Sequence, residues 1–135
     1  MRLLIDANVV LDVLQKREPY WKDSSLVWKL CETEQAKGHV SALSFANLVD
    51  VMRKEFNAEQ IHDVLKKLQL IFRFEDFSAA DMEKAAEMKW DDFEDAVQSA
   101  TAERIAADCI VTRNVRDFRY SKIIAFTPEE LIARI

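Results

Sequence analysis

Glycine, proline, cysteine and histidine are all scarce in this chain. Its 135 residues include one glycine, two prolines, two cysteines and two histidines. Few connections can then use the positive φ angles that glycine favours, so we expect helix-rich structure with short, ordinary turns. Cys31 and Cys109 lie far apart, with no Cys-x-x-Cys pair and no histidine at ligand spacing. We interpret both as buried, reduced thiols of a cytoplasmic protein, forming neither a disulfide nor a zinc site.

Long apolar runs and a positive net charge are also missing. No segment reaches the roughly 18 consecutive apolar residues of a membrane span, and the first residues become charged too soon for a signal peptide. The net charge of −5 argues against a protein that coats nucleic acid by bulk electrostatics. It does not argue against an enzyme that handles RNA at a local patch. Half of the residues are hydrophobic, which predicts one domain over residues 1–135 with one well-buried core.

Segments typical of strands alternate with helical patterns along the chain. We expect strands at 2–5, 39–41, 70–74, 109–111 and 122–125, and helices at 8–15, 20–36, 45–52, 57–68, 78–88, 91–107 and from 128 onward. Asn57, Ser78 and Thr127 are placed to cap the helices that follow them, and Gly38 to end the second helix in a left-handed conformation. This alternation predicts a three-layer α/β/α sandwich whose central sheet is mainly parallel, with about five strands.

Polar side chains fall where predicted strands end. Asp6 follows the first strand and Asn8 comes two residues later, while Thr112 and Asn114 follow the fourth strand. In such sheets, binding sites form beyond the carboxyl ends of the strands, where the strand order reverses. We therefore expect Asp6 and Asn114 to converge.

The helix predicted from residue 91 begins with acidic residues. Asp92, Glu94 and Asp95 lie in its first turn, and Asp95, Ser99 and Ala102 share one face. A small, polar face with a carboxylate fits a metal pocket better than a core. Mg²⁺ and Mn²⁺ prefer oxygen ligands, and such an ion lowers the pKa of coordinated water and shields charge on a phosphate.

Each of these residues also has an ordinary structural interpretation. Asp6 is a favoured N-cap, and acids in a first turn complement the helix dipole. Asp117 can be a turn residue, and the basic side chains between 113 and 122 can form a solvated loop. The combination favours a site because all of these residues fall on the same side of the predicted sheet.

Five short segments carry a more specific signal through their order. They are LIDANVVLD at 4–12, VSALS at 40–44, DFEDA at 92–96, IVTRNVRDF at 110–118 and TPEE at 127–130. Together they resemble the PIN-domain nucleases, the family that includes the bacterial VapC-type toxins. The resemblance runs nearly end to end and implies a PIN-like fold and metal-dependent hydrolysis of RNA phosphodiester bonds with Mg²⁺ or Mn²⁺. It also implies a small antitoxin partner and a homodimer.

The resemblance assigns acids by position, with two departures. Asp6 matches the first metal acid of the family and Asp95 the third. Many members carry a Glu where Asn47 stands here, with Asp50 one helical turn later. The fourth acid is replaced by Asn114, and an aspartate, residue 117, follows three residues on. Amide oxygens ligate hard cations more weakly than carboxylates do, so the acid set is incomplete at these two places.

These observations define the predicted site. The catalytic residues are Asp6, Asp95 and Asp117, and the metal ligands are Asp6, Asp95, Asn114 and Asp117. The supporting residues are Asn8, Ser41, Asn47, Asp50, Asp92, Glu94 and Thr112. The residues that would hold RNA phosphates are Arg113, Arg116, Arg119 and Lys122. Single-stranded RNA fits best, because an acidic protein with a narrow site grips a duplex poorly.

Two other functions compete with an active ribonuclease, whether or not it acts as a toxin. The amides at 47 and 114 favour a degenerate domain that binds RNA or a protein partner without catalysis. A phosphotransfer domain would use Asp6 as its nucleophile. However, a haloacid-type phosphatase needs a second Asp where Asn8 stands, and a receiver needs a Lys after a late strand, whereas Lys122 precedes one.

Overall fold

The computed structural model describes residues 1–135, in which strands and helices alternate. The strands are β1 (Arg2–Ile5), β2 (Lys37–Ser41), β3 (Arg73–Glu75), β4 (Cys109–Val111) and β5 (Ala125–Phe126). The helices are α1 (Ala7–Leu14), α2 (Trp21–Glu32), α3 (Ala42–Met52), α4 (Ala58–Ile71), α5 (Ala79–Met88), α6 (Phe93–Arg104) and α7 (Pro128–Ala133), with a 3-10 helix η1 (Val115–Phe118). None of the helices combines the length and apolar character needed to cross a membrane.

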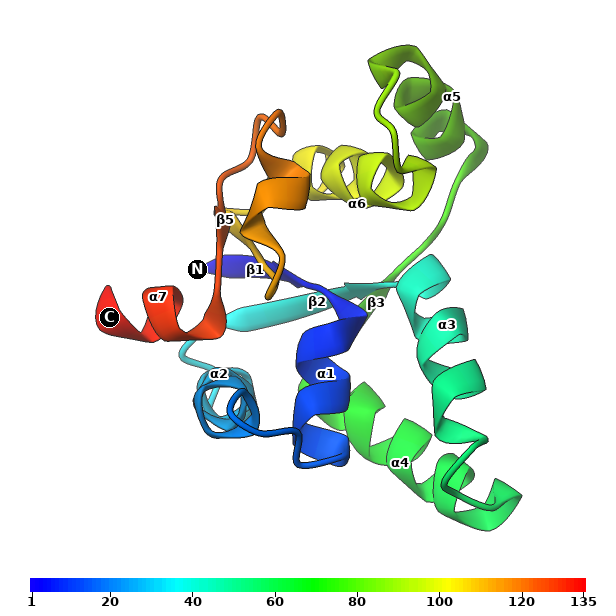
Figure 1. Cartoon of the computed structure of the whole chain (residues 1–135), viewed down its shortest axis with the longest axis vertical. Coiled ribbons are helices and arrows are strands. Elements are labelled where there is room, and N and C mark those ends of the chain that lie inside the picture. The colour runs from blue at the N-terminus through cyan, green and yellow to red at the C-terminus, as the bar shows by residue number, and fades with distance from the viewer.

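All five strands run parallel in one sheet, in the order β3-β2-β1-β4-β5. The chain builds the sheet outward from β1 through β2 to β3, and then crosses to the other side of β1 for β4 and β5 (Figure 1). The order therefore reverses at β1, whose carboxyl end lies between those of β2 and β4. This arrangement confirms the predicted parallel sheet and places the expected site at the end of β1.

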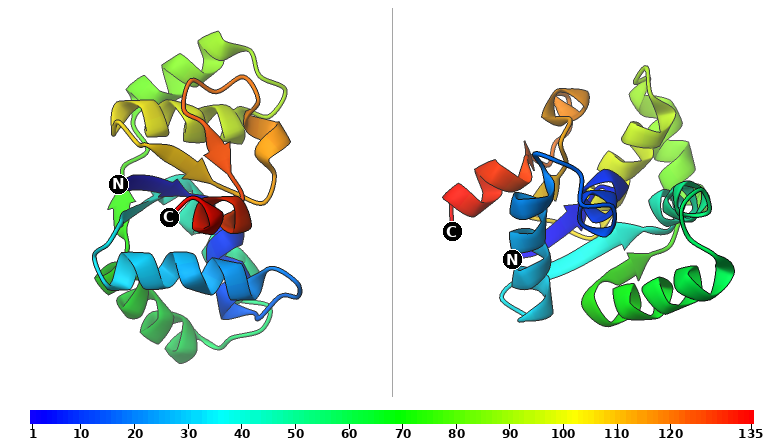
Figure 2. Two further views of the ribbon diagram at one scale, coloured as in Figure 1. Left: turned by 90° about the vertical axis from the view of Figure 1, so that its left-hand side faces the viewer. Right: turned by 60° about the horizontal axis from the view of Figure 1, so that its bottom comes forward.

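Alternate side chains of β1 enter two different cores. Leu3 and Ile5 pack in the larger core with residues of α1, α2, α3, α4 and α7. Leu4 points to the opposite face, where it packs with Ala102 of α6 and Ile110 of β4. Helices therefore cover both faces of the sheet, as Figure 2 shows from two sides, and the predicted three-layer α/β/α sandwich is confirmed.

Several predicted boundaries were wrong by a few residues. Helix α4 continues to Ile71, so β3 begins at Arg73, and β5 covers only Ala125–Phe126 instead of 122–125. Helix α6 is shorter at both ends than the predicted 91–107. The side chain of Asp92 caps its start, and Ala106, with φ 53°, turns the chain away after its end.

The prediction that Gly38 ends the second helix was wrong. Helix α2 ends at Glu32, Glu34 takes the left-handed conformation with φ 61°, and Gly38 lies within β2. A Cβ atom on Gly38 would stand 2.7 Å from Cys31 Sγ and 2.8 Å from Phe72 Cδ1. Close packing of α2 and α4 against β2 therefore explains this glycine, not backbone freedom.

The predicted caps and buried thiols are confirmed. Asn57, Ser78 and Thr127 each form a reciprocal capping box with the residue three positions later. Cys31 and Cys109 are buried and free. Burial raises the pKa of the Cys31 thiol to about 12 and that of Cys109 to about 11, so both are inert at neutral pH.

Candidate active site

Asp6 stands at the end of β1, and its carboxylate is turned toward β4 and α6. The residue occupies the N-cap position of α1, yet its side chain makes no capping hydrogen bond. Instead Thr112 Oγ1 donates to Asp6 Oδ2 at 2.9 Å, and Gln98 Nε2 donates to Asp6 Oδ1 at 3.5 Å. The ordinary interpretation of Asp6 as a side-chain cap is therefore not realised.

Asp95 lies in the first turn of α6, and Asp92 fixes where that turn begins. Asp92 Oδ1 accepts the backbone N–H of Asp95 at 3.0 Å. Burial, and after it the charges of Asp92, Asp117, Asp6 and Glu94, together raise the pKa of the Asp95 carboxyl to about 7. Charges from three separate segments act on this one carboxyl, so these acids share one region at the carboxyl edge of the sheet.

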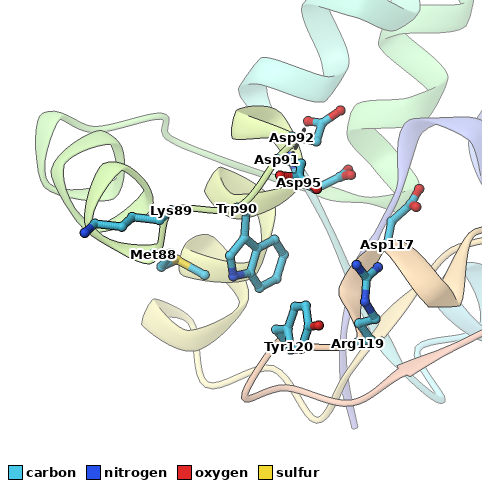
Figure 3. Close-up of a pocket in the computed structure, with 9 residues that line it drawn as sticks. All are labelled: Met88, Lys89, Trp90, Asp91, Asp92, Asp95, Asp117, Arg119 and Tyr120. Carbon is cyan, nitrogen blue, oxygen red and sulfur yellow. Dashed lines mark hydrogen bonds between the residues drawn. The ribbon is translucent and has the colours of Figure 1, made fainter.

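Asp117 and Asp95 line the same cavity, which has a volume of about 400 Å³ (Figure 3). Asp117 reaches it from η1. Asn114 is exposed outside this cavity, and its backbone N–H donates to Thr112 Oγ1 at 3.1 Å. Of the two predicted candidates for the fourth acid position, Asp117 is therefore the one beside Asp95.

The Asn47 amide contacts a carboxylate at the start of α6. Its Nδ2 donates to Glu94 Oε1 at 2.8 Å, so the amide holds an acid in place. Asp50 lies outside the cluster, exposed on α3 and paired with Arg53 at 3.1 Å. Glu94 is thus the acid in contact with Asn47, the residue that stands where many family members carry a Glu.

Two of the predicted supporting residues make no side-chain hydrogen bond to the acids. Ser41 is fully buried, and its Oγ accepts the backbone N–H of Leu43 at 3.3 Å as the cap of α3. Asn8 is half-buried in the first turn of α1.

Arg113, predicted to hold RNA phosphates, is turned into the protein. Its Nε lies 3.1 Å from Oδ2 of Asp12, a fully buried residue of α1. Its guanidinium also lies over the Tyr20 ring, 4.4 Å from the centroid. Burial raises the pKa of Asp12, while Arg113 and Arg17 oppose that increase. Arg113 is thus engaged in linking α1 to the loop after β4.

The other predicted cations are exposed but lie in different places. Arg116 and Arg119 belong to η1 and the residue after it, and Arg119 lines the cavity with Asp117. Lys122 lies 3.9 Å from Glu103, near the end of α6. That is about 12 Å along the helix from Asp95 at 1.5 Å per residue. Arg119 is therefore the predicted cation that lines the cavity with Asp95 and Asp117.

A comparison with family models identifies the chain. The model of the PIN domain matches residues 2–116. The chain belongs to the PIN-domain family. The match gives no support to the phosphotransfer alternative. A comparison with curated protein sequences finds no significant match.

Solved structures share the PIN fold at low sequence identity. VapBC2 from Rickettsia felis, solved with a DNA fragment from its promoter, aligns with a TM-score of 0.69 and 18% identity over 94% of this chain and 98% of that chain. FitAcB from Neisseria gonorrhoeae aligns with a TM-score of 0.68 and 20% identity over 94% and 98%. A toxin–antitoxin complex from Klebsiella pneumoniae aligns with a TM-score of 0.72 and 19% identity over 93% and 97%.

The acids of this PIN domain fit a divalent cation in donor type and in charge. The acidic side chains near Asp95 offer oxygen atoms, and after burial their negative charges contribute to its raised pKa. No three acidic, histidine or cysteine side chains lie close enough to form a complete metal cage in this structure. The fit is therefore one of donor chemistry and charge.

Sequence reasoning missed Gln98 and misplaced one face of α6. Ser99 Oγ is 2.7 Å from Ser121 Oγ, and Ala102 packs in the core with Leu4, so neither points into the site. The residue that reaches Asp6 is Gln98, one helical turn after Asp95. Gln98 lies three residues after Asp95, and this i, i+3 spacing, which puts both side chains on one side of the helix, was the signal in the sequence.

Proposed function

We propose that this PIN domain is a divalent-metal-dependent endoribonuclease that hydrolyses RNA phosphodiester bonds, and that it is the toxin of a toxin–antitoxin pair. The observation that carries the proposal is that Asp95 and Asp117 line one cavity where the strand order reverses, with Asp6 near enough for its charge to act on Asp95. A cluster of repelling carboxylates is unfavourable for an isolated fold, and a bound cation relieves it.

Asp6 and Asp95 are the proposed holders of Mg²⁺ or Mn²⁺, with Asp117 as the third acid. A cation bound there supplies positive charge beside the scissile phosphate and lowers the pKa of water that it coordinates. Hydrogen bonds from Thr112 and Gln98 orient the Asp6 carboxylate. Such outer partners are worth roughly 10- to 100-fold in metal affinity or activity.

The two amides do not leave the site without acids. Asn47 positions Glu94, and Asp117 stands beside Asp95 where Asn114 does not. We therefore favour an active nuclease over a degenerate binding module. A calorimetric titration with Mn²⁺ separates the two, since no binding at millimolar ion would favour the module.

The nuclease proposal is tested by Mn²⁺-dependent cleavage of a panel of single-stranded and structured RNAs. Asp6→Asn and Asp95→Asn should each lower the rate at least about 100-fold, because each removes a charged ligand. Asp50→Asn is the matched control. Asp50 is exposed and paired with Arg53, so this variant should retain full activity. Circular dichroism would verify the fold of each variant. Unchanged cleavage by an Asp6→Asn/Asp95→Asn double variant would refute the metal site.

The antitoxin partner is supported by the structural relatives, one of which is a toxin–antitoxin complex. A short reading frame directly upstream of the gene should encode this partner. Co-expression of the two products should yield a complex that purifies together. A solitary gene would count against the toxin role and leave the nuclease proposal intact.

A further inference from the structure

Two aromatic rings lie in the cavity beside the acids. Trp90 belongs to the connection between α5 and α6, and Tyr120 follows η1, so different parts of the chain supply them. Figure 3 shows both rings on one side of the cavity and the carboxylates of Asp92, Asp95 and Asp117 on the other. The cavity therefore combines flat apolar surface with hydrogen-bond acceptors.

The two rings differ in how firmly they are held. Trp90 is half-buried and packs edge-on against Phe118, with ring centroids 6.3 Å apart at 71°. Tyr120 is 73% exposed, and the guanidinium of Arg119 lies over its ring at 4.7 Å from the centroid. Trp90 is thus a fixed wall, while Tyr120 and Arg119 form an exposed edge that a ligand can contact.

The chemistry of this cavity selects among ligands. Asp91, Asp92, Asp95 and Asp117 outnumber Lys89 and Arg119 among its lining residues. Away from a bound cation, a phosphate is therefore disfavoured in its interior, whereas a neutral ring is not. Flat rings stack on tryptophan and tyrosine, and exposed carboxylates accept hydrogen bonds from amino groups. The bases of a duplex are already stacked and paired, so only a single strand can offer a free base face.

We propose that this cavity holds one unstacked nucleobase of single-stranded RNA, next to the phosphate cleaved at the acid cluster. The base contacts Trp90 and Tyr120, and its amino group faces Asp91 or Asp92. Adenine, cytosine and guanine carry such an amino group and uracil does not, so uracil binds most weakly. The inference rests on the proposed nuclease function and adds a substrate subsite to it.

The subsite can be tested without metal or cleavage. Cytidine is titrated in EDTA into the ¹⁵N-labelled full chain, and the indole N–H signals of its tryptophans are followed by NMR. The signal of Trp90 should shift, while two internal controls should not. The Trp28 indole nitrogen is buried, and that of Trp21 donates to Glu18 at 2.8 Å. Uridine should shift Trp90 less, and Tyr120→Leu should weaken both responses.

Cleavage kinetics supply the second measurement. A set of short RNAs carries one abasic position each, placed at successive points along the strand. At one of these positions the loss of the base should raise the KM for wild type by about 5- to 150-fold, the effect of losing one stacked base. Tyr120→Leu should raise the KM for the intact RNA, and should add little for the RNA that is abasic at that position. Leu70→Ala, another highly exposed site, is the control and should behave as wild type.

The outcomes separate the two proposals. Active cleavage, with no Trp90 shift up to the solubility limit of cytidine and no sensitive abasic position, overturns the base subsite alone. A Trp90 shift with no cleavage of any RNA overturns the nuclease and supports base binding. If Tyr120→Leu leaves both RNA measurements unchanged and instead weakens a protein complex, the cavity is a protein-docking surface and the subsite is refuted.

Discussion

At the scale of single residues, the acids at the carboxyl edge of the sheet repel one another, and Asp95 shows the effect most clearly. Its neighbours Asp92, Asp117, Asp6 and Glu94 all disfavour its ionised form, in addition to burial. The position of Asp95 therefore costs stability in the metal-free protein. This is the pattern expected where a fold retains charge for binding instead of for its own stability.

Replacing Asp95 by Asn should stabilise the metal-free protein at alkaline pH. The pKa is about 7 in the folded state against 3.8 for the free group. Between these values the unfolded chain has lost a proton that the folded chain keeps, so the wild-type free energy of unfolding falls as pH rises from about 4 to about 7. Above pH 7 the variant should be more stable by about 1–2 kcal/mol, a value reduced for solvent screening.

Urea unfolding in EDTA across this pH range measures the difference. It should vanish near pH 4, where both states hold the proton. Asp50→Asn should show no such pH-dependent gain, since Asp50 is exposed and paired with Arg53. A variant less stable than wild type at pH 8 would contradict the prediction.

At the scale of secondary-structure elements, the close approach of α2 and α4 to β2 depends on one missing side chain. Gly38 leaves room for Cys31 of α2 and for Phe72, which follows α4. Gly38 does not have a positive φ angle, so the strand keeps ordinary extended geometry there. Packing between layers therefore constrains this position more than its own backbone does.

Gly38→Ala should lower the free energy of unfolding by about 1–3 kcal/mol, as overpacking of a core does. The added methyl would stand 2.7 Å from Cys31 Sγ and 3.1 Å from Ile5 Cδ1, both in the core. Urea unfolding measures the loss. The double variant Gly38→Ala/Cys31→Ala should recover part of it relative to Cys31→Ala alone, because the sulfur atom is then absent. A Gly38→Ala protein as stable as wild type would contradict the steric explanation.

At the scale of the whole molecule, the pair of Asp12 and Arg113 ties the beginning of the chain to the loop after β4. The two residues are far apart in sequence, yet Arg113 Nε lies 3.1 Å from Asp12 Oδ2. Asp12 also accepts a long hydrogen bond from Ser24 Oγ at 3.5 Å. The pair therefore joins α1, α2 and the β4–η1 loop beside Asp6.

Arg113→Met should cost about 3 kcal/mol at pH 8, because it leaves a buried carboxylate without its partner. The cost should shrink toward pH 5, since burial already raises the pKa of Asp12 and loss of Arg113 raises it further. Urea unfolding at the two pH values measures this dependence. Arg116→Met, exposed on η1, should change stability by less than about 0.5 kcal/mol. Equal stability of the two variants at pH 8 would show that the buried pair is not needed.

The sequence by itself determined the local features of this protein. Capping boxes at Asn57, Ser78 and Thr127, the alternation of strands and helices and the strand-end position of Asp6 all depend on residues a few positions apart. Hydrogen bonds and side-chain patterns of that range are readable along the chain. The parallel sheet followed from them, because a strand–helix–strand order with short connections permits few other arrangements.

Only the tertiary structure decided which side chains meet. The contacts of Asn47 with Glu94, of Gln98 with Asp6 and of Arg113 with Asp12 each join elements distant in sequence. They depend on the crossover from β3 to β4 and on the rotation of α6 against the sheet, which no local pattern specifies. The same crossover brings Trp90 and Tyr120 to one cavity. The positions of the acids were therefore predictable, whereas their partners and the aromatic wall beside them were not.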